Sequence, residues 1–167
     1  LCQRNWPVVQ DYLSRSQALF TKIGLVDYAP ELERRWAEYY LETGQMDQAL
    51  EHARRSVELA VEQHKPLEEG LSHRTLGQVR LARGEREAAE AALLSSLRLL
   101  GDAKNDQVAR TKLALARLNL ETGDTDQARS WLTQASATFQ MLGAQPALDK
   151  ARELERRLEL ASASPSS

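Results

Sequence analysis

The sequence predicts an all-α protein in which antiparallel helix pairs stack into one domain, and three observations predict it. The chain of 167 residues contains only 8 Gly and 5 Pro, which leaves few places for turns and favours long helices over many short strands. Apolar residues recur three and four positions apart, as they do on the buried face of a helix. A short motif also returns at near-constant spacing, which indicates a repeat architecture.

The repeated motif is a glycine that a small residue precedes by seven positions and an alanine follows five positions later. Its glycines are Gly44, Gly84 and Gly123, which lie 40 and 39 residues apart. We expect each glycine to end a helix in the left-handed conformation, and the small residues to let two helices approach closely. Each copy is therefore predicted to be a helical hairpin. The small residues are Ala37, Gly77 and Ala116, and the alanines are Ala49, Ala89 and Ala128.

The N-terminal segment resembles the second helix of the last repeat. In both segments an aromatic residue is followed by Phe eight positions later and by Gly twelve positions later. We interpret the N-terminal segment as half a repeat and expect the chain, which shows no signal peptide, to be a piece of a longer protein. The matching residues are Tyr12, Phe20 and Gly24 in the first segment, and Trp131, Phe139 and Gly143 in the second.

The C-terminal segment is predicted to be a capping helix followed by a flexible tail. Four apolar residues from Leu148 to Leu158 fall on one helix face, and the other faces are charged, as the end of a soluble repeat stack requires. The small polar residues after them cannot bury enough surface to become ordered. The predicted domain spans 1–160, with a half repeat at 6–28, repeats at 30–66, 69–104 and 106–143, a cap at 146–160, and the tail at 161–167.

Composition excludes several classes of function. Lys plus Arg is 22 and Asp plus Glu is 24, so the formal net charge is −2, whereas nucleic-acid and anionic-membrane binders normally carry a basic excess. No apolar run approaches the roughly 20 residues that cross a bilayer. Cys2 is the only cysteine, so no internal disulfide can form. We predict a cytoplasmic protein with no nucleic-acid and no membrane partner.

No pattern in the sequence indicates catalysis. The histidines His52, His64 and His73 lack a second His or Cys one helical turn away, and one nearby carboxylate makes a poor metal site. No glycine-rich phosphate-binding motif occurs. We therefore predict solvent-facing histidines and a protein that is not an enzyme, with no catalytic residue, no metal ligand and no cofactor.

The spacing of the small residue, the glycine and the alanine is similar to that of the tetratricopeptide repeat (TPR). The TPR leucine position holds Trp36, Leu76 and Leu115, so Trp36 is predicted to be a core residue, whereas Trp131 is either core or a binding anchor. The tyrosine position keeps Tyr40 alone, and the period exceeds the usual ~34 residues. This longer period resembles repeat arrays of bacterial multidomain regulators. The resemblance implies a right-handed superhelix of antiparallel helix pairs that acts as a protein-binding scaffold in signalling.

The resemblance also implies a concave groove lined by the first helix of each repeat. The residues at the groove positions would form an apolar floor flanked by arginines, which suit carboxylates. We predict a groove for a helix or extended segment with apolar and acidic side chains, supplied by another protein, a peptide or another domain of the same chain. The competing interpretation pairs the arginines with glutamates on neighbouring turns. The predicted groove residues are Arg34, Glu38, Leu41, Arg74, Gln78, Leu81, Arg110, Leu113, Arg117 and Leu120.

Two alternative functions remain open at this point. One is self-association, in which the N-terminal edge or the outer helix faces join two copies into a homodimer. The other is a receptor for a signalling peptide, which would need a deep groove with several converging polar groups.

Overall fold

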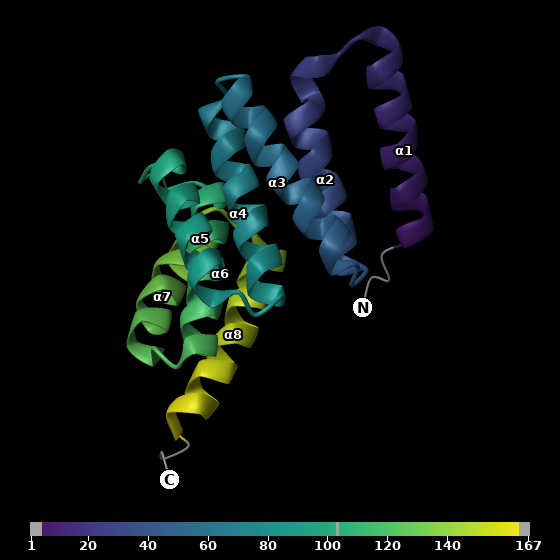
Figure 1. Ribbon diagram of the computed structural model, residues 1–167. Coiled ribbons are helices and arrows are strands. Elements are labelled where there is room, and N and C mark those ends of the chain that lie inside the picture. The colour runs from purple at the N-terminus through teal and green to yellow at the C-terminus, as the bar shows by residue number, and fades with distance from the viewer. Residues whose placement is uncertain (1–4, 103, 164–167) are drawn as a thin grey trace.

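The computed structural model describes residues 5–102 and 104–163, and every regular element in this part of the chain is helical (Figure 1). The fold is an all-α helical-repeat solenoid, as the sequence predicts. Its elements are α1 (Trp6–Ile23), the 3-10 helix η1 (Val26–Tyr28), α2 (Ala29–Glu42), α3 (Met46–Glu62), α4 (Pro66–Ala82), α5 (Arg86–Leu100), α6 (Asp106–Thr122), α7 (Thr125–Met141) and α8 (Gln145–Ala163).

The three predicted hairpins are α2–α3, α4–α5 and α6–α7. Gly44, Gly84 and Gly123 stand at their turns with φ of 80°, 78° and 88°, which confirms the left-handed conformation expected from the repeat. The small residues lie where the two helices approach. A Cβ atom added at Gly77 would lie 2.6 Å from Cγ of Leu93, so even alanine would force the second hairpin apart.

The helices form two layers, and neighbouring helices lie closer together in one layer than in the other. The backbones of the first helices approach one another closely in the order α2, α4, α6 and α8, whereas in the described part of the chain the backbones of α3 and α5, and of α5 and α7, do not. A stack whose first helices touch and whose second helices are spread apart must curve toward the first helices. The layer of α2, α4, α6 and α8 is therefore the inner face, on which the predicted groove residues lie.

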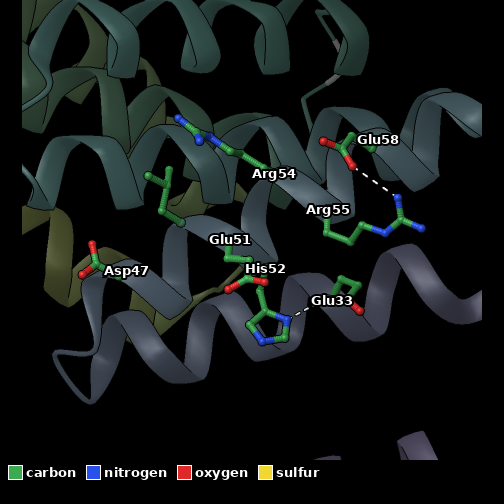
Figure 2. Close-up of a pocket in the computed structure, with 8 residues that line it drawn as sticks. Glu33, Asp47, Glu51, His52, Arg54, Arg55 and Glu58 are labelled. Carbon is green, nitrogen blue, oxygen red and sulfur yellow. Dashed lines mark hydrogen bonds and ion pairs between the residues drawn. The ribbon is translucent and has the colours of Figure 1, made fainter.

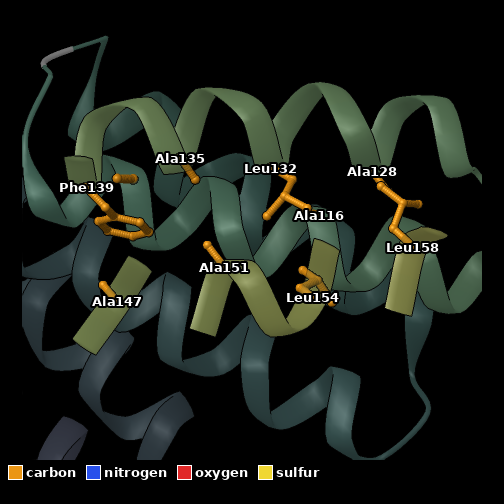
Figure 3. Packing of buried hydrophobic residues seen from close by; sticks show 10 residues of the cluster. Ala116, Ala128, Leu132, Ala135, Phe139, Ala147, Ala151, Leu154 and Leu158 are labelled. Carbon is orange, nitrogen blue, oxygen red and sulfur yellow. The ribbon is translucent and has the colours of Figure 1, made fainter. Parts of the chain in front are cut away.

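Successive hairpins are joined by pairs of small buried residues at equivalent positions. Ser56 Oγ of α3 lies 2.6 Å from Ser72 Oγ of α4, and Ser96 Oγ of α5 lies 3.1 Å from Thr111 Oγ1 of α6. At the third junction the corresponding places are taken by two fully buried alanines. These are Ala135 of α7 and Ala151 of α8 (Figure 3).

The largest cluster of buried hydrophobic residues lies at the C-terminal end. Phe139 of α7 is fully buried and packs in one cluster with Leu132 of α7 and with Leu154 and Leu158 of α8 (Figure 3). Trp36, in the first hairpin, is also buried, which confirms its prediction as a core residue.

Two predicted boundaries are wrong. Helix α4 begins at Pro66, before the expected start of the second repeat at 69, because proline is well suited to the first turn of a helix, where its missing N–H is not needed. Helix α8 continues to Ala163, so residues 161–163 are helical rather than part of a tail. Residues 164–167 of that predicted tail, like Cys2, lie outside the described residues.

Candidate functional site

The inner face brings two buried arginines close together, one from α2 and one from α4. Arg34 is 4% exposed, and its Nε donates to Glu68 Oε1 at 2.6 Å across the α2–α4 junction. Its Nη1 also donates to Glu38 Oε1 at 3.2 Å, and a third carboxylate, from Glu31, lies 3.9 Å away. Burial alone would lower the pKa of Arg34, but Glu68, Glu38 and Glu31 together raise it above its ordinary value. The positive charge of this guanidinium is therefore balanced by carboxylates.

Arg74 occupies the equivalent position in the next repeat, but it forms no direct ion pair with a carboxylate of the described residues. It is 7% exposed, and its Nη1 donates to Gln107 Oε1 at 2.8 Å and to the backbone oxygen of Gln107 at 3.2 Å. No carboxylate oxygen lies within 4.0 Å of it in the part of the chain that the structure describes. Burial and then the charge of Arg34 lower the pKa of Arg74 to about 10, although Glu38 and Asp106 oppose the shift. Arg74 is therefore still a cation at neutral pH, and its hydrogen-bond acceptors are neutral atoms of Gln107.

The difference between the two arginines comes from one residue of the following repeat. Arg34 and Arg74 both stand three positions before the small residue of their repeat. Their partners, Glu68 and Gln107, both stand nine positions before the small residue of the next repeat. The two junctions thus share one geometry, and the amide of Gln107 replaces a carboxylate. Glu68 and Gln107 are not among the predicted groove residues, although both hold the same position in the repeat register.

The remaining arginines of the predicted groove are paired along their own helix. Arg110 Nε lies 2.6 Å from Asp106 Oδ2, and Arg117 Nε lies 2.9 Å from Glu121 Oε1, both four residues apart. The competing interpretation, in which arginines pair with acidic residues nearby, therefore describes these two and Arg34. It does not describe Arg74.

The predicted apolar floor is largely used in packing the hairpins together. Leu81 is buried among Leu93, Leu115 and Leu118, so its placement on an open groove floor is wrong. The cause is the contact between α4 and α6, which side chains at this position fill. The other predicted leucines are partly buried against core clusters. They are Leu41 in the first hairpin, and Leu113 and Leu120 against the α7–α8 cluster.

The flank of the first hairpin carries a polar hollow of about 590 Å³ (Figure 2). Within it His52 Nδ1 lies 2.6 Å from Glu33 Oε2, and its ring stacks on Tyr40 at 5.2 Å. His52 is half-buried, so the prediction of a solvent-facing side chain is wrong here and holds only for exposed His64. The rest of the hollow contains both carboxylates and arginines, so it presents no single charge to a ligand. Its lining is Glu33, Asp47, Leu50, Glu51, His52, Arg54, Arg55 and Glu58.

The described residues also lack two features that would indicate other functions. They contain no group of three or more His, Cys, Asp or Glu side chains placed to hold a metal ion. None of their helices combines the length and the apolar character that a membrane span requires.

Comparison with known proteins identifies the repeat. The family model described as tetratricopeptide repeat matches residues 109–134, which run from α6 into α7. The chain is TPR-like. Its third hairpin, which contains this match, is also the one with the strongest core. Repeats of this family generally mediate protein–protein interaction as non-enzymatic scaffolds.

A solved structure supports the same fold for the TPR-like chain as a whole. The crystal structure of BtubC (BKLC) from P. vanneervenii aligns with a TM-score of 0.63 over 95% of this chain and 78% of that chain. Sequence identity is 17%, so the likeness concerns the fold alone. No curated protein matches the chain.

Proposed function

We propose that this TPR-like chain is a non-catalytic scaffold whose inner face binds an acidic side chain of a partner segment at Arg74. The observation that carries the proposal is a buried guanidinium whose hydrogen-bond acceptors are both neutral atoms of Gln107. A buried charge without a counter-ion is costly, and a carboxylate that reached it would form a charge-assisted pair.

Hydrogen-bonding capacity remains for such a ligand. A guanidinium has five N–H donors, and Gln107 engages Nη1 alone. Arg110 lowers the pKa of Arg74 further, whereas Glu38 and Asp106 oppose the shift from a distance. A ligand carboxylate would therefore be held by direct hydrogen bonds to the free N–H groups of Arg74 rather than by a wide positive patch.

The partner segment is therefore expected to be extended or helical, with an Asp or Glu that reaches the α4–α6 junction. Apolar side chains beside that residue would lie against the partly buried leucines of the inner face. Such a segment can belong to another protein, to a signalling peptide or to another domain of the same chain, since the recognised chemistry is the same.

The test uses peptides of about 12 residues selected on the purified chain from a displayed random library. We expect selected peptides to share an acidic residue, and its replacement by the corresponding amide to weaken binding at least tenfold, or about 1.4 kcal/mol. The protein variant Gln107→Glu supplies Arg74 with an internal carboxylate, by analogy with Glu68. It should weaken the same peptides at least tenfold, measured by fluorescence anisotropy, while the chain stays folded.

The matched control is Arg117→Gln, which removes an exposed arginine that is already paired on α6. We expect it to change affinity less than twofold. Selected peptides without an acidic residue, or full affinity in Gln107→Glu, would contradict the proposal.

A further inference from the structure

The outer face of α1 carries an apolar stripe that nothing in the described chain covers. Val8 is 60% exposed, Tyr12 70%, Leu19 53% and Ile23 58%. At 3.6 residues per turn these four side chains fall within about 60° of one another around the helix. The side of α1 that packs on α2 is a different one, centred on buried Leu13. Helix α1 thus has two apolar faces, and only one of them packs against the described chain.

Helix α7 shows what such a second face does in this fold. It repeats the aromatic, Phe and Gly spacing of α1, and its Trp131 corresponds to Tyr12. Trp131 is partly buried and packs against clusters contributed by helices on both sides of it. The Tyr12 position of this face is therefore a helix-packing position on α7, whereas the Val8 and Ile23 positions are exposed there as Gln127 and Leu142.

The stripe on α1 is self-complementary in antiparallel register. If two copies of α1 pair about a twofold axis beside Arg15, Val8 of one copy lies opposite Ile23 of the other, and Tyr12 lies opposite Leu19. Both pairs satisfy the same axis, because each has its midpoint between residues 15 and 16. A twofold interface requires one patch that matches itself in this way.

Charge does not oppose this pairing. Arg15 lies at the centre of the stripe, and its Nη1 is 3.6 Å from Asp11 Oδ2 on the preceding turn. Two such pairs meeting at the axis carry no net charge. The polar positions next to the stripe therefore tolerate a second copy.

The stripe runs along most of helix α1. Helix α1 has 18 residues, or about 27 Å at 1.5 Å per residue. Val26 and Tyr28 of η1, which follows α1 in the chain, are also more than half exposed. Exposed apolar patches beyond a few hundred Å² mark interaction sites, and a stable interface needs about 800 Å² from each partner.

We infer that the outer face of α1 is a self-association surface, which pairs with the same face of a second copy of this chain in antiparallel register. The inference is independent of the inner-face proposal, because α1 does not contribute to the α4–α6 junction.

Oligomeric state tests the inference. Sedimentation velocity of the purified chain, from about 1 to 500 µM, should show a reversible monomer–dimer equilibrium with a dissociation constant on the order of micromolar. Tyr12→Glu should shift that constant at least tenfold toward monomer, since it places two charges in the interface. The matched control, Leu160→Glu on α8, changes a side chain of the same 70% exposure and should leave the dimer intact. A monomer at every concentration overturns the inference, and so does growth beyond a dimer, which would mean head-to-tail contact.

Disulfide trapping tests the register in a Cys2→Ser background. Arg15→Cys should form a disulfide-linked dimer by itself, because the axis passes beside it. Val8→Cys should link to Ile23→Cys in a mixture but not to itself, since the two Val8 positions lie about 22 Å apart along the helix. Linkage of Val8→Cys to itself at the rate of the mixture would overturn the antiparallel pairing.

Discussion

The two end helices of the stack are similar in length and opposite in what they present to water. Helix α8 buries Ala147, Ala151, Leu154 and Leu158 against the last hairpin, whereas α1 buries Leu13 alone. The outer face of α8 is charged, and that of α1 is apolar. The end of a repeat stack is stable in water only where its outer face is polar. The C-terminal end is therefore closed, and the N-terminal end is a surface that favours a further helix.

Local signals show the same contrast between the two halves. The N-caps of α6 and α7 are the only ones with a side-chain bond among the helices from α1 to α7: Asn105 accepts from the backbone N–H of Val108, and Asp124 from that of Gln127, both at 3.0 Å. The third hairpin thus has better helix starts as well as the stronger core. Its stability should exceed that of the N-terminal hairpin.

The largest effect should come from the C-terminal core. Phe139→Ala removes a fully buried ring and should lower the free energy of unfolding by about 3–5 kcal/mol. Leu13→Ala, in α1, should cost no more than about 2 kcal/mol, because α1 packs against neighbours on one side only. Urea unfolding followed by circular dichroism measures both. Equal losses in the free energy of unfolding would contradict the view that the C-terminal end is the more stable one.

A smaller effect should separate the capped helices from the uncapped ones. Asn105→Ala should cost about 1 kcal/mol, because it leaves the N–H of Val108 without its acceptor. Gln45→Ala, at the start of α3, removes no capping bond and should change stability by less than about 0.5 kcal/mol. Thermal unfolding of the two variants tests this, and a cost at Gln45 equal to that at Asn105 would contradict it.

The smallest effect concerns the middle of the stack, between the two ends. Burial lowers the pKa of His73 below its ordinary value of 6.5, although nearby Glu69 opposes the shift. The folded state therefore favours neutral His73, so its contribution to stability is present above pH 6.5 and is lost as pH falls from 6.5 toward the lowered pKa. His73→Gln should make the urea midpoint less sensitive to pH in this window, and exposed His64→Gln should not. Identical pH profiles for His73→Gln and the unmodified chain would contradict the assignment.

Repeat periodicity predicted what depends on neighbours in sequence. The hairpin turns at Gly44, Gly84 and Gly123 and the burial of Trp36 follow from residues within one repeat, and the structure confirms them. The burial of a side chain could not be predicted where a residue of another repeat covers it. Leu81 is covered because α6 touches α4.

The same limit applies to the two buried arginines. Arg34 and Arg74 hold the same position in their repeats, and each is fixed by a residue of the following one. Helix periodicity places both side chains on the inner face, but the choice between Glu68 and Gln107 decides which of them is neutralised. The sequence places both residues at one position of the repeat, and the contact across the junction shows that they are the partners of the two arginines.

Native-state hydrogen exchange compares the two ends most directly. We predict that, in dilute solution, the backbone amides of α8 are protected to nearly the same degree as those of α6 and α7, while those of α1 exchange at least tenfold faster. Protection of α1 should then rise with protein concentration, and that of α8 should not. Amides of α1 as protected as those of α8 at every concentration would contradict the account of one open and one closed end.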